Sequence, residues 1–200
     1  MAKANWLNVQ PSTGSGDGTV QVSSTAEHTG RKVRTTTLTW RAANVEDVVR
    51  TVNQAGKPEF TSMASSAAAD KLGKVVTISG QSNSAKLTFS LGTGNLQVSL
   101  PSTYTANSVS TSNGAAITGD PGAVAVYPFS IAITVPANET IAAMSRQIIV
   151  TDEAGNRATC TLTLAAGDPF VIIAEGDIEL DYKGTAVTVA VDSNCDWSVI

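Results

Sequence analysis

The centre of the chain reads Tyr127-Pro128-Phe129-Ser130-Ile131-Ala132-Ile133-Thr134-Val135, with a large apolar side chain at every second position. A period of two is the spacing at which the side chains of a β-strand share one face. The same alternation recurs at residues 87–91, 96–100, 160–164 and 187–199. Strands with one apolar and one polar face are typical of antiparallel sandwiches. The sequence therefore predicts an all-β fold.

The composition argues against several classes of function. Of the 200 residues, 42% are hydrophobic and only 15% are charged, and the net charge is −4 with no basic run. Without a basic face that neutralises phosphates, nucleic-acid binding is not expected. No apolar stretch approaches the roughly 18 residues that cross a bilayer, so no membrane partner is expected either. The N-terminus lacks the basic and then apolar pattern of a secretory signal, which predicts synthesis in a cytoplasm without export.

Charge is distributed unevenly along the chain. Residues 1–56 carry six basic and four acidic side chains, a net charge of +2, and residues 57–167 carry six of each. Residues 168–200 carry one basic and seven acidic side chains, a net charge of −6. Opposite potentials favour contact between the first and last segments. The alternative is that both are simply solvated faces.

Two stretches near the ends of the chain resemble parts of one known domain. The first reads Trp6-Leu7-Asn8-Val9-Gln10-Pro11-Ser12-Thr13-Gly14-Ser15-Gly16-Asp17-Gly18, followed by Thr29-Gly30-Arg31 and Thr51-Val52-Asn53-Gln54-Ala55-Gly56. It resembles the second half of a BACON domain, an immunoglobulin-like β-sandwich common in Bacteroidetes and their phages. The second, Val189-Ala190-Val191-Asp192-Ser193-Asn194-Cys195-Asp196-Trp197-Ser198-Val199, resembles the first half of that domain. Between them, Ile148-Ile149-Val150-Thr151-Asp152-Glu153-Ala154-Gly155-Asn156 is similar to the last hairpin of bacterial immunoglobulin-like repeats.

The resemblance implies two immunoglobulin-like β-sandwiches built from three segments. Residues 1–56 form the N-terminal half of a BACON-like sandwich, residues 57–167 form an immunoglobulin-like sandwich, and residues 168–200 supply C-terminal strands that complete a BACON-like sandwich. The two halves occur in the reverse of the family's order. The C-terminal strands therefore close on their own chain, complete a neighbouring subunit, or stay loose until assembly. A chain cut from a longer array of such domains would show the same order.

Strand parity favours completion by a neighbouring subunit. We count seven or eight strands in residues 57–167, and an odd number places the two ends of a sandwich on opposite sides. A return along the same chain would then span roughly 35 Å, about two strand lengths. The connector at residues 165–169 reaches only about 17 Å when fully extended.

The exchanged strands are expected to bury their alternating apolar residues. The expected donor residues are Ile178, Leu180, Val187, Val189, Val191 and Trp197. The expected accepting core consists of Trp6, Leu7, Val9, Leu38 and Trp40. The acidic residues Asp177, Glu179 and Asp181 share one strand face and are expected to meet the basic residues Arg31, Lys32, Arg34 and Arg41. Burial of the apolar donors would contribute on the order of 10 kcal/mol at most.

No catalytic motif is found in the sequence, so neither an enzyme nor a cofactor is expected. The one histidine, His28, has no metal ligands at suitable spacing and is expected in a surface loop. Cys160 and Cys195 lie on apolar strand faces and are expected to be free, buried thiols, with a structural disulfide as the less favoured alternative. Tyr104, in a loop rich in Ser and Thr, is the best candidate for an exposed aromatic that contacts a glycan.

The resemblance, the missing export signal and the split domain together favour a virion protein that lysis releases. We expect a non-enzymatic structural protein of the capsid auxiliary, decoration or head-fibre type, similar to proteins of crAss-like Bacteroides phages. Its expected partners are further copies of itself and other capsid proteins. The alternative is an adhesion module that binds host-surface glycan or mucin.

Overall fold

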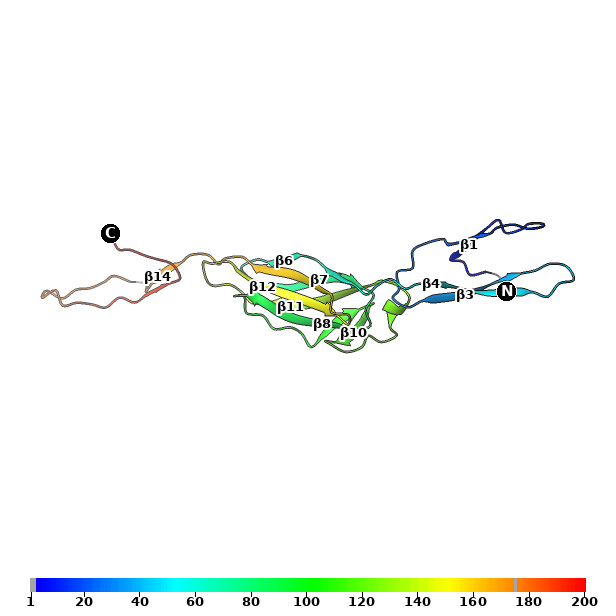
Figure 1. The fold of residues 1–200 in the computed structure, drawn as a ribbon. Helices are drawn as coiled ribbons and strands as arrows, with labels where there is room; N and C mark the ends of the chain where they lie inside the picture. Colours follow the sequence, from blue (N-terminus) through cyan, green and yellow to red (C-terminus); the bar gives the residue numbers. More distant parts are fainter. Residues whose placement is uncertain (1–2, 175) are drawn as a thin grey trace.

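The computed structural model describes residues 3–174 and 176–200. The molecule is elongated, with a β-sandwich at its centre, two hairpins beyond one end and one hairpin beyond the other (Figure 1). Apart from one short 3-10 turn, η1 (Pro121–Ala123), every regular element of the described residues is a strand. The predicted all-β, sandwich-type fold is confirmed.

Two sheets form the central sandwich. The five-stranded sheet has the order β10-β9-β11-β7-β5, and the four-stranded sheet has the order β6-β13-β12-β8. All neighbouring strands are antiparallel except β6 and β13, which are parallel. In chain order the strands are β5 (Thr61–Met63), β6 (Ser66–Ala69), β7 (Lys74–Ser82), β8 (Leu87–Gly94), β9 (Thr103–Ala106), β10 (Val109–Ser112), β11 (Tyr127–Val135), β12 (Met144–Asp152) and β13 (Arg157–Leu164).

The core lies between these two sheets and follows from the alternating sequence. Along β11 every second side chain points inward, and each of these apolar side chains is at most 3% exposed. Strand β13 presents the matching row of the opposite sheet, Cys160, Leu162 and Leu164. Each large apolar side chain buried in this way contributes about 1.5–3 kcal/mol. All the residues of this core cluster belong to the middle segment, residues 57–167.

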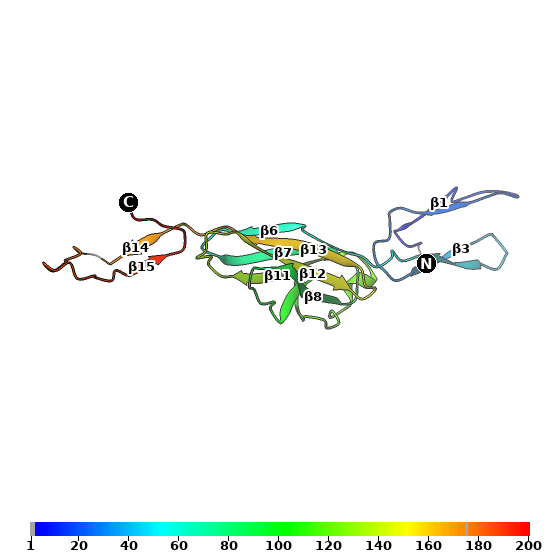
Figure 2. The ribbon, with the colours of Figure 1, turned by 60° about the vertical axis from the view of Figure 1, so that its left-hand side comes forward.

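The central sandwich contains nine strands rather than the seven or eight expected from the sequence. The difference arises because the first strand is split: β5 pairs with one sheet and β6 with the other. The backbone changes sheets at Ala64, whose amide donates to the Ser79 carbonyl, and at Ser65, whose carbonyl accepts from the Thr161 amide. The number of strands is nevertheless odd, and the chain enters and leaves at opposite ends of the sandwich (Figure 2).

One predicted strand in the middle segment is wrong. Residues 96–100 belong to no sheet, although Leu96 is only 1% exposed. The guanidinium of Arg146 donates to the carbonyls of Leu96 and Gly92, and the register of β8 on β12 shifts beside it. A side chain thus satisfies a carbonyl of this segment that a strand partner would otherwise satisfy.

The remaining strands form three two-stranded hairpins at the ends of the molecule. On the N-terminal side, β1 (Leu7–Gln10) pairs with β2 (Gln21–Ser24), and β3 (Arg34–Trp40) pairs with β4 (Val48–Gln54); on the C-terminal side, β14 (Val171–Ile173) pairs with β15 (Val191–Ser193). The strand predicted over residues 187–199 is regular only in β15. A two-stranded hairpin is at best marginally stable in water, so each of these needs further packing.

Candidate assembly interface

The N-terminal segment, before residue 57, contains two hairpins that touch along only part of their length. Two of its apolar residues are buried: Leu7 of β1 is 2% exposed and Leu38 of β3 is 8% exposed. The guanidinium of Arg34 lies 4.5 Å from the ring centroid of Trp6 and thereby joins the two hairpins. The side chain of Gln54 continues this link, since its oxygen accepts from Arg34 and its amide donates to the Ser24 hydroxyl of β2 at 3.1 Å.

A groove of about 860 Å³ separates the hairpins farther out. It is lined by the loop 11–20, by Val9 of β1 and by the end of β3 around Trp40, whose side chain is 42% exposed. Strand β3 pairs only with β4, so its other edge is without a partner among the described residues. The groove thus combines a sheet edge with apolar side chains, which are the two things an added strand requires.

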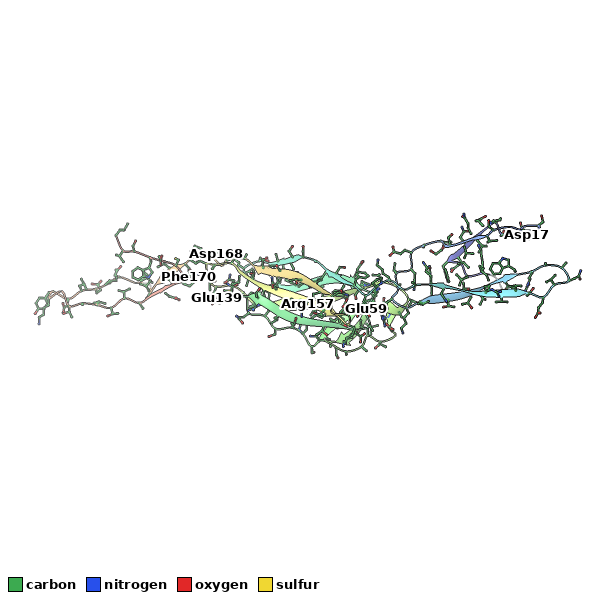
Figure 3. All side chains as sticks on the ribbon, viewed as in Figure 1. Asp17, Glu59, Glu139, Arg157, Asp168 and Phe170 are labelled. Carbon is green, nitrogen blue, oxygen red and sulfur yellow. The ribbon has the colours of Figure 1, made fainter. Side chains whose placement is uncertain are left out.

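The C-terminal segment presents its apolar residues to solvent. Only three residues of each strand pair in β14 and β15, and the chain between them extends away from the sandwich. Figure 3 shows these side chains, beginning at Phe170, with no second layer against them. The exposed fractions are 61% for Ile178, 60% for Leu180, 52% for Val187, 36% for Val189 and 53% for Trp197. Val191 is half-buried against its hairpin partner.

A turn closes the far end of this segment. The carboxylate of Asp181 accepts hydrogen bonds from the amides of Lys183 and Thr185 and from the Thr185 hydroxyl. These bonds hold the pKa of Asp181 below its usual value. Tyr182, at the turn, is 93% exposed. The segment is therefore extended, and a hydrogen-bonded turn closes its far end. We call residues 168–200 the C-terminal arm.

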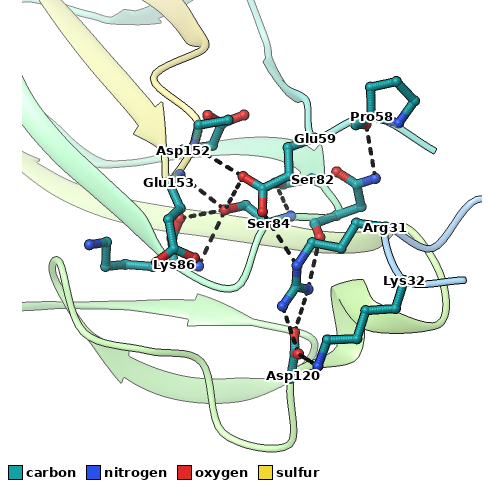
Figure 4. A network of polar contacts seen from close by, with 12 residues as sticks. Arg31, Lys32, Pro58, Glu59, Ser82, Ser84, Lys86, Asp120, Asp152 and Glu153 are labelled. Carbon is teal, nitrogen blue, oxygen red and sulfur yellow. Dashed lines mark hydrogen bonds and ion pairs between the residues drawn. The ribbon is translucent and has the colours of Figure 1, made fainter. Parts of the chain in front are cut away.

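The junction between the N-terminal hairpins and the central sandwich is a polar network (Figure 4). Arg31 makes two hydrogen bonds to the carboxylate of Asp120, at 2.5 and 2.6 Å, and its Nε lies 3.3 Å from Glu59. The guanidinium of Arg31 holds the pKa of Asp120 below its usual value. The Asn83 side chain is fully buried beneath this network, accepts from the Phe60 amide and donates to three backbone carbonyls.

A second asparagine holds the opposite junction. The amide of Asn194, which follows β15, donates to the carbonyls of Glu139 and Asp168 at 2.7 and 2.9 Å. Its oxygen accepts from the Phe170 amide at 3.0 Å. Lys71 pairs with the Asp168 carboxylate from the sandwich side. The base of the C-terminal arm is therefore tied to loops of the central sandwich, which Figure 3 places at Glu139 and Asp168.

These contacts correct the expected roles of the basic residues. Arg31 and Lys32 both pair with Asp120 within the chain, and Arg34 covers Trp6. These three side chains therefore already have partners within the same chain.

Two other arginines remain near the groove. Arg41 lines it and forms an exposed pair with Asp47 at 2.8 Å. Arg50 of β4 lies opposite Leu38 in the register and is exposed, with a hydrogen bond to the neighbouring Val49 carbonyl. The positive charges beside the groove are therefore those of Arg50, of Lys3, which also lines the groove, and of Arg41, which is paired with Asp47.

Two further expectations about single residues are wrong. Tyr104 is 3% exposed and packs with its ring centroid 5.0 Å from that of Phe89, so it is a core residue and no exposed platform for a glycan. His28 is not a surface residue: it is 6% exposed, and its Nε2 lies 2.6 Å from the Lys32 carbonyl. Both cysteines are free thiols, but Cys160 is fully buried whereas Cys195 is partly exposed.

The described part of the chain shows no group of three acidic, histidine or cysteine side chains placed to hold a metal ion. Among the same residues, no helix is long and apolar enough to cross a bilayer.

Comparisons with known proteins add little. No family model matches the sequence, and no curated protein matches it. Among solved structures, an endo-fucoidan hydrolase from glycoside hydrolase family 107 aligns over 82% of this chain with 10% sequence identity and a TM-score of 0.32. The alignment covers 22% of that enzyme's chain. A likeness this distant carries no argument about function.

The two asparagines that hold the junctions are the residues that the sequence did not reveal. Asn83 stands in Ser82-Asn83-Ser84, which reads as an ordinary polar turn. Its partners Thr29 and Lys57 lie 54 and 26 residues away in the chain. Asn194 lies inside the stretch that resembles the BACON family, but its contact with Glu139 spans 55 residues.

Proposed function

We propose that this chain is a non-enzymatic structural protein whose copies join head to tail. The C-terminal arm of one copy enters the groove between the N-terminal hairpins of the next copy and completes a second sandwich there. The observation that carries the proposal is the exposure of apolar side chains on both terminal segments, at opposite ends of a well-packed sandwich. An exposed apolar surface of this kind is typical of an interaction site.

Charge and sequence both support a second copy as the occupant of the groove. The N-terminal segment carries +2 and the C-terminal segment −6, so the two attract each other while two C-terminal arms repel. The two segments also resemble complementary halves of one domain. Within one copy, the two segments lie at opposite ends of the central sandwich and do not meet (Figures 1 and 2).

For the biological setting, we propose a virion protein of the capsid auxiliary, decoration or head-fibre type in a Bacteroides phage. The support is the resemblance of both terminal segments to the BACON family. Other capsid proteins would then be the further partners.

The three tryptophans provide a direct test of the assembly. All of them lie outside residues 57–167, and Trp40 and Trp197 are 42% and 53% exposed. If the arm enters the groove, tryptophan emission shifts to the blue as protein concentration rises, in parallel with the mass measured by light scattering. A Trp197→Ala variant should dissociate about 30- to 150-fold more readily, since a buried interface tryptophan contributes about 2–3 kcal/mol.

The matched control is Leu72→Ala, which removes a 76% exposed apolar side chain from the central sandwich. It should leave both mass and emission unchanged. A monomer at every concentration, with no shift in emission, would refute assembly by arm exchange.

One observation favours a second candidate, glycan binding. Trp40 is an exposed aromatic beside the loop 11–20, which is rich in Ser and Thr, and aromatic faces with nearby hydroxyls can bind sugars. A Trp40→Ala variant that loses binding to a mucin column while keeping its assembly state would support that function instead.

A further inference from the structure

We infer that the assembly is an open, straight fibre rather than a closed ring; this rests on the proposed head-to-tail exchange. A contact between two different surfaces of the same chain closes into a ring only when the rotation between successive copies bends the assembly back to its start. When the two surfaces lie on one line, successive copies are related by a translation along that line, with or without a rotation about it, and the assembly stays open. Whether the assembly stays open therefore depends on where the arm and the groove lie, and on how rigidly each is attached to the central sandwich.

Arm and groove lie at opposite ends of the long axis. Figures 1 and 2 view the molecule from directions 60° apart, and in both the hairpins extend the central sandwich along its length. A neighbour that accepts the arm would thus continue the same line.

The junction at the groove end is stiff because two passes of the chain are bonded there. The amides of Arg31 and Lys32 donate to the carbonyls of Gly122 and Ala123, at 2.9 and 3.1 Å. On the returning pass, the Lys57 amide donates to the Gly30 carbonyl at 2.8 Å. Main-chain bonds of this kind, together with the ion pairs of Arg31, leave no hinge between the hairpins and the sandwich.

Gly30 shows how closely the two parts approach. A Cβ atom placed on Gly30 would lie 2.3 Å from the backbone carbonyl carbon of Val124, far inside van der Waals contact. Backbone packed against backbone moves less readily than side chains do, which limits bending at this junction.

The junction at the arm end is also held on both strands of its hairpin. Asn194, which follows β15, bonds to the carbonyls of Asp168 and Glu139, and the Gly167 amide donates to the Thr140 carbonyl at 2.7 Å. Gly167 again permits a close approach, since an added Cβ would lie 2.3 Å from the Asn138 carbonyl oxygen. The direction of the arm is therefore set by the central sandwich.

Electron microscopy of the full chain at a concentration where it assembles tests the inference. We expect unbranched rods with one repeat per copy of about 45–60 Å, because each copy contributes two sandwiches whose longest strands, of seven to nine residues, are about 23–30 Å long. Closed rings of uniform size, or a dimer that grows no further, would overturn the fibre while leaving the exchange itself intact. A chain that stays monomeric would instead refute the proposed function.

Two variants sharpen the test. A full-length chain with Val189→Asp and Trp197→Ala keeps its groove but has a defective arm, so a small proportion of it should end fibres and shorten their mean length. In a closed ring the same copy would leave one contact unmade and open the ring. Asn194→Ala removes the clamp at the arm, and we expect fibres that still form but curve more strongly. Fibres of unchanged straightness in that variant would contradict the role assigned to the junction.

Discussion

Replacement of Arg31 by methionine tests the groove-end junction most directly. Arg31 makes two short hydrogen bonds to Asp120, an ion pair to Glu59 and a hydrogen bond to the Asn83 carbonyl at 3.2 Å. Hydrogen bonds to charged groups contribute about 1.5–3 kcal/mol each. The side chains of Asp120 and Glu59 are 31% and 18% exposed and regain water when the arginine is lost. We therefore expect a net loss of about 2–3 kcal/mol in the free energy of unfolding, less than the sum of the bonds.

Urea unfolding followed by near-UV circular dichroism of the core tyrosines is the assay, because the tryptophans report on other segments. For a urea dependence of about 1–3 kcal/mol per M, the midpoint should fall by roughly 0.7–3 M in the variant. The matched control is Arg41→Met, which removes an exposed pair with Asp47 and should cost less than about 1 kcal/mol. Equal midpoints for the two variants would refute the view that Arg31 holds the junction.

Three further results are expected. Arg31 holds the pKa of Asp120 below its unfolded value of about 4, so this carboxylate stabilises the fold fully above that pH and progressively less as the pH falls below it. The urea midpoints of the Arg31→Met variant and of the parent chain should therefore converge in acid. A constant difference between the two midpoints down to pH 2 would contradict the assignment. Burial raises the pKa of the Cys160 thiol, whereas Cys195 is partly exposed. Iodoacetamide should therefore modify Cys195 at least ten-fold faster than Cys160 in the folded protein. Equal rates of modification, measured by mass spectrometry, would contradict the burial of Cys160 in the core. Tyr104→Ala should cost about 3–5 kcal/mol in calorimetry or urea unfolding, and Tyr104→Phe less than about 1 kcal/mol, since among the described residues the hydroxyl has no hydrogen-bond partner.

The sequence predicted those strands whose burial is a local property. Alternation at residues 87–91, 127–135 and 160–164 marks strands that the structure contains, because each has apolar residues on one face and at least one neighbouring strand in its sheet. The same alternation failed at residues 96–100 and over most of residues 187–199. A β-strand needs a hydrogen-bonded neighbouring strand, and the alternation within one segment does not show whether such a neighbour exists.

Tyr104 illustrates a different failure. Its polar neighbours suggested an exposed loop. In the structure these residues form a strand, in which successive side chains point to opposite faces, so Thr103 and Thr105 face outward while Tyr104 faces the core. The correct signal was the period of two around a single aromatic residue, which is too short to distinguish a four-residue strand from a loop. The role of Asn83 was beyond reach for another reason, since its burial depends on three carbonyls brought together only by the fold.

The charge distribution bears on which contacts the exposed ends make. Unpaired strand edges and apolar faces associate readily with one another, so a molecule with two such ends needs some means of choosing among the pairings. Two C-terminal arms bring net charges of −6 together, whereas an arm and an N-terminal half bring −6 and +2. Asp177 and Glu179 alternate with the apolar Ile178 and Leu180, so a strand formed here carries an acidic row on the face opposite its apolar row. Repulsion between arms thus disfavours the symmetric pairing that would end growth at a dimer, and it leaves the head-to-tail pairing that the proposed fibre requires as the favoured one.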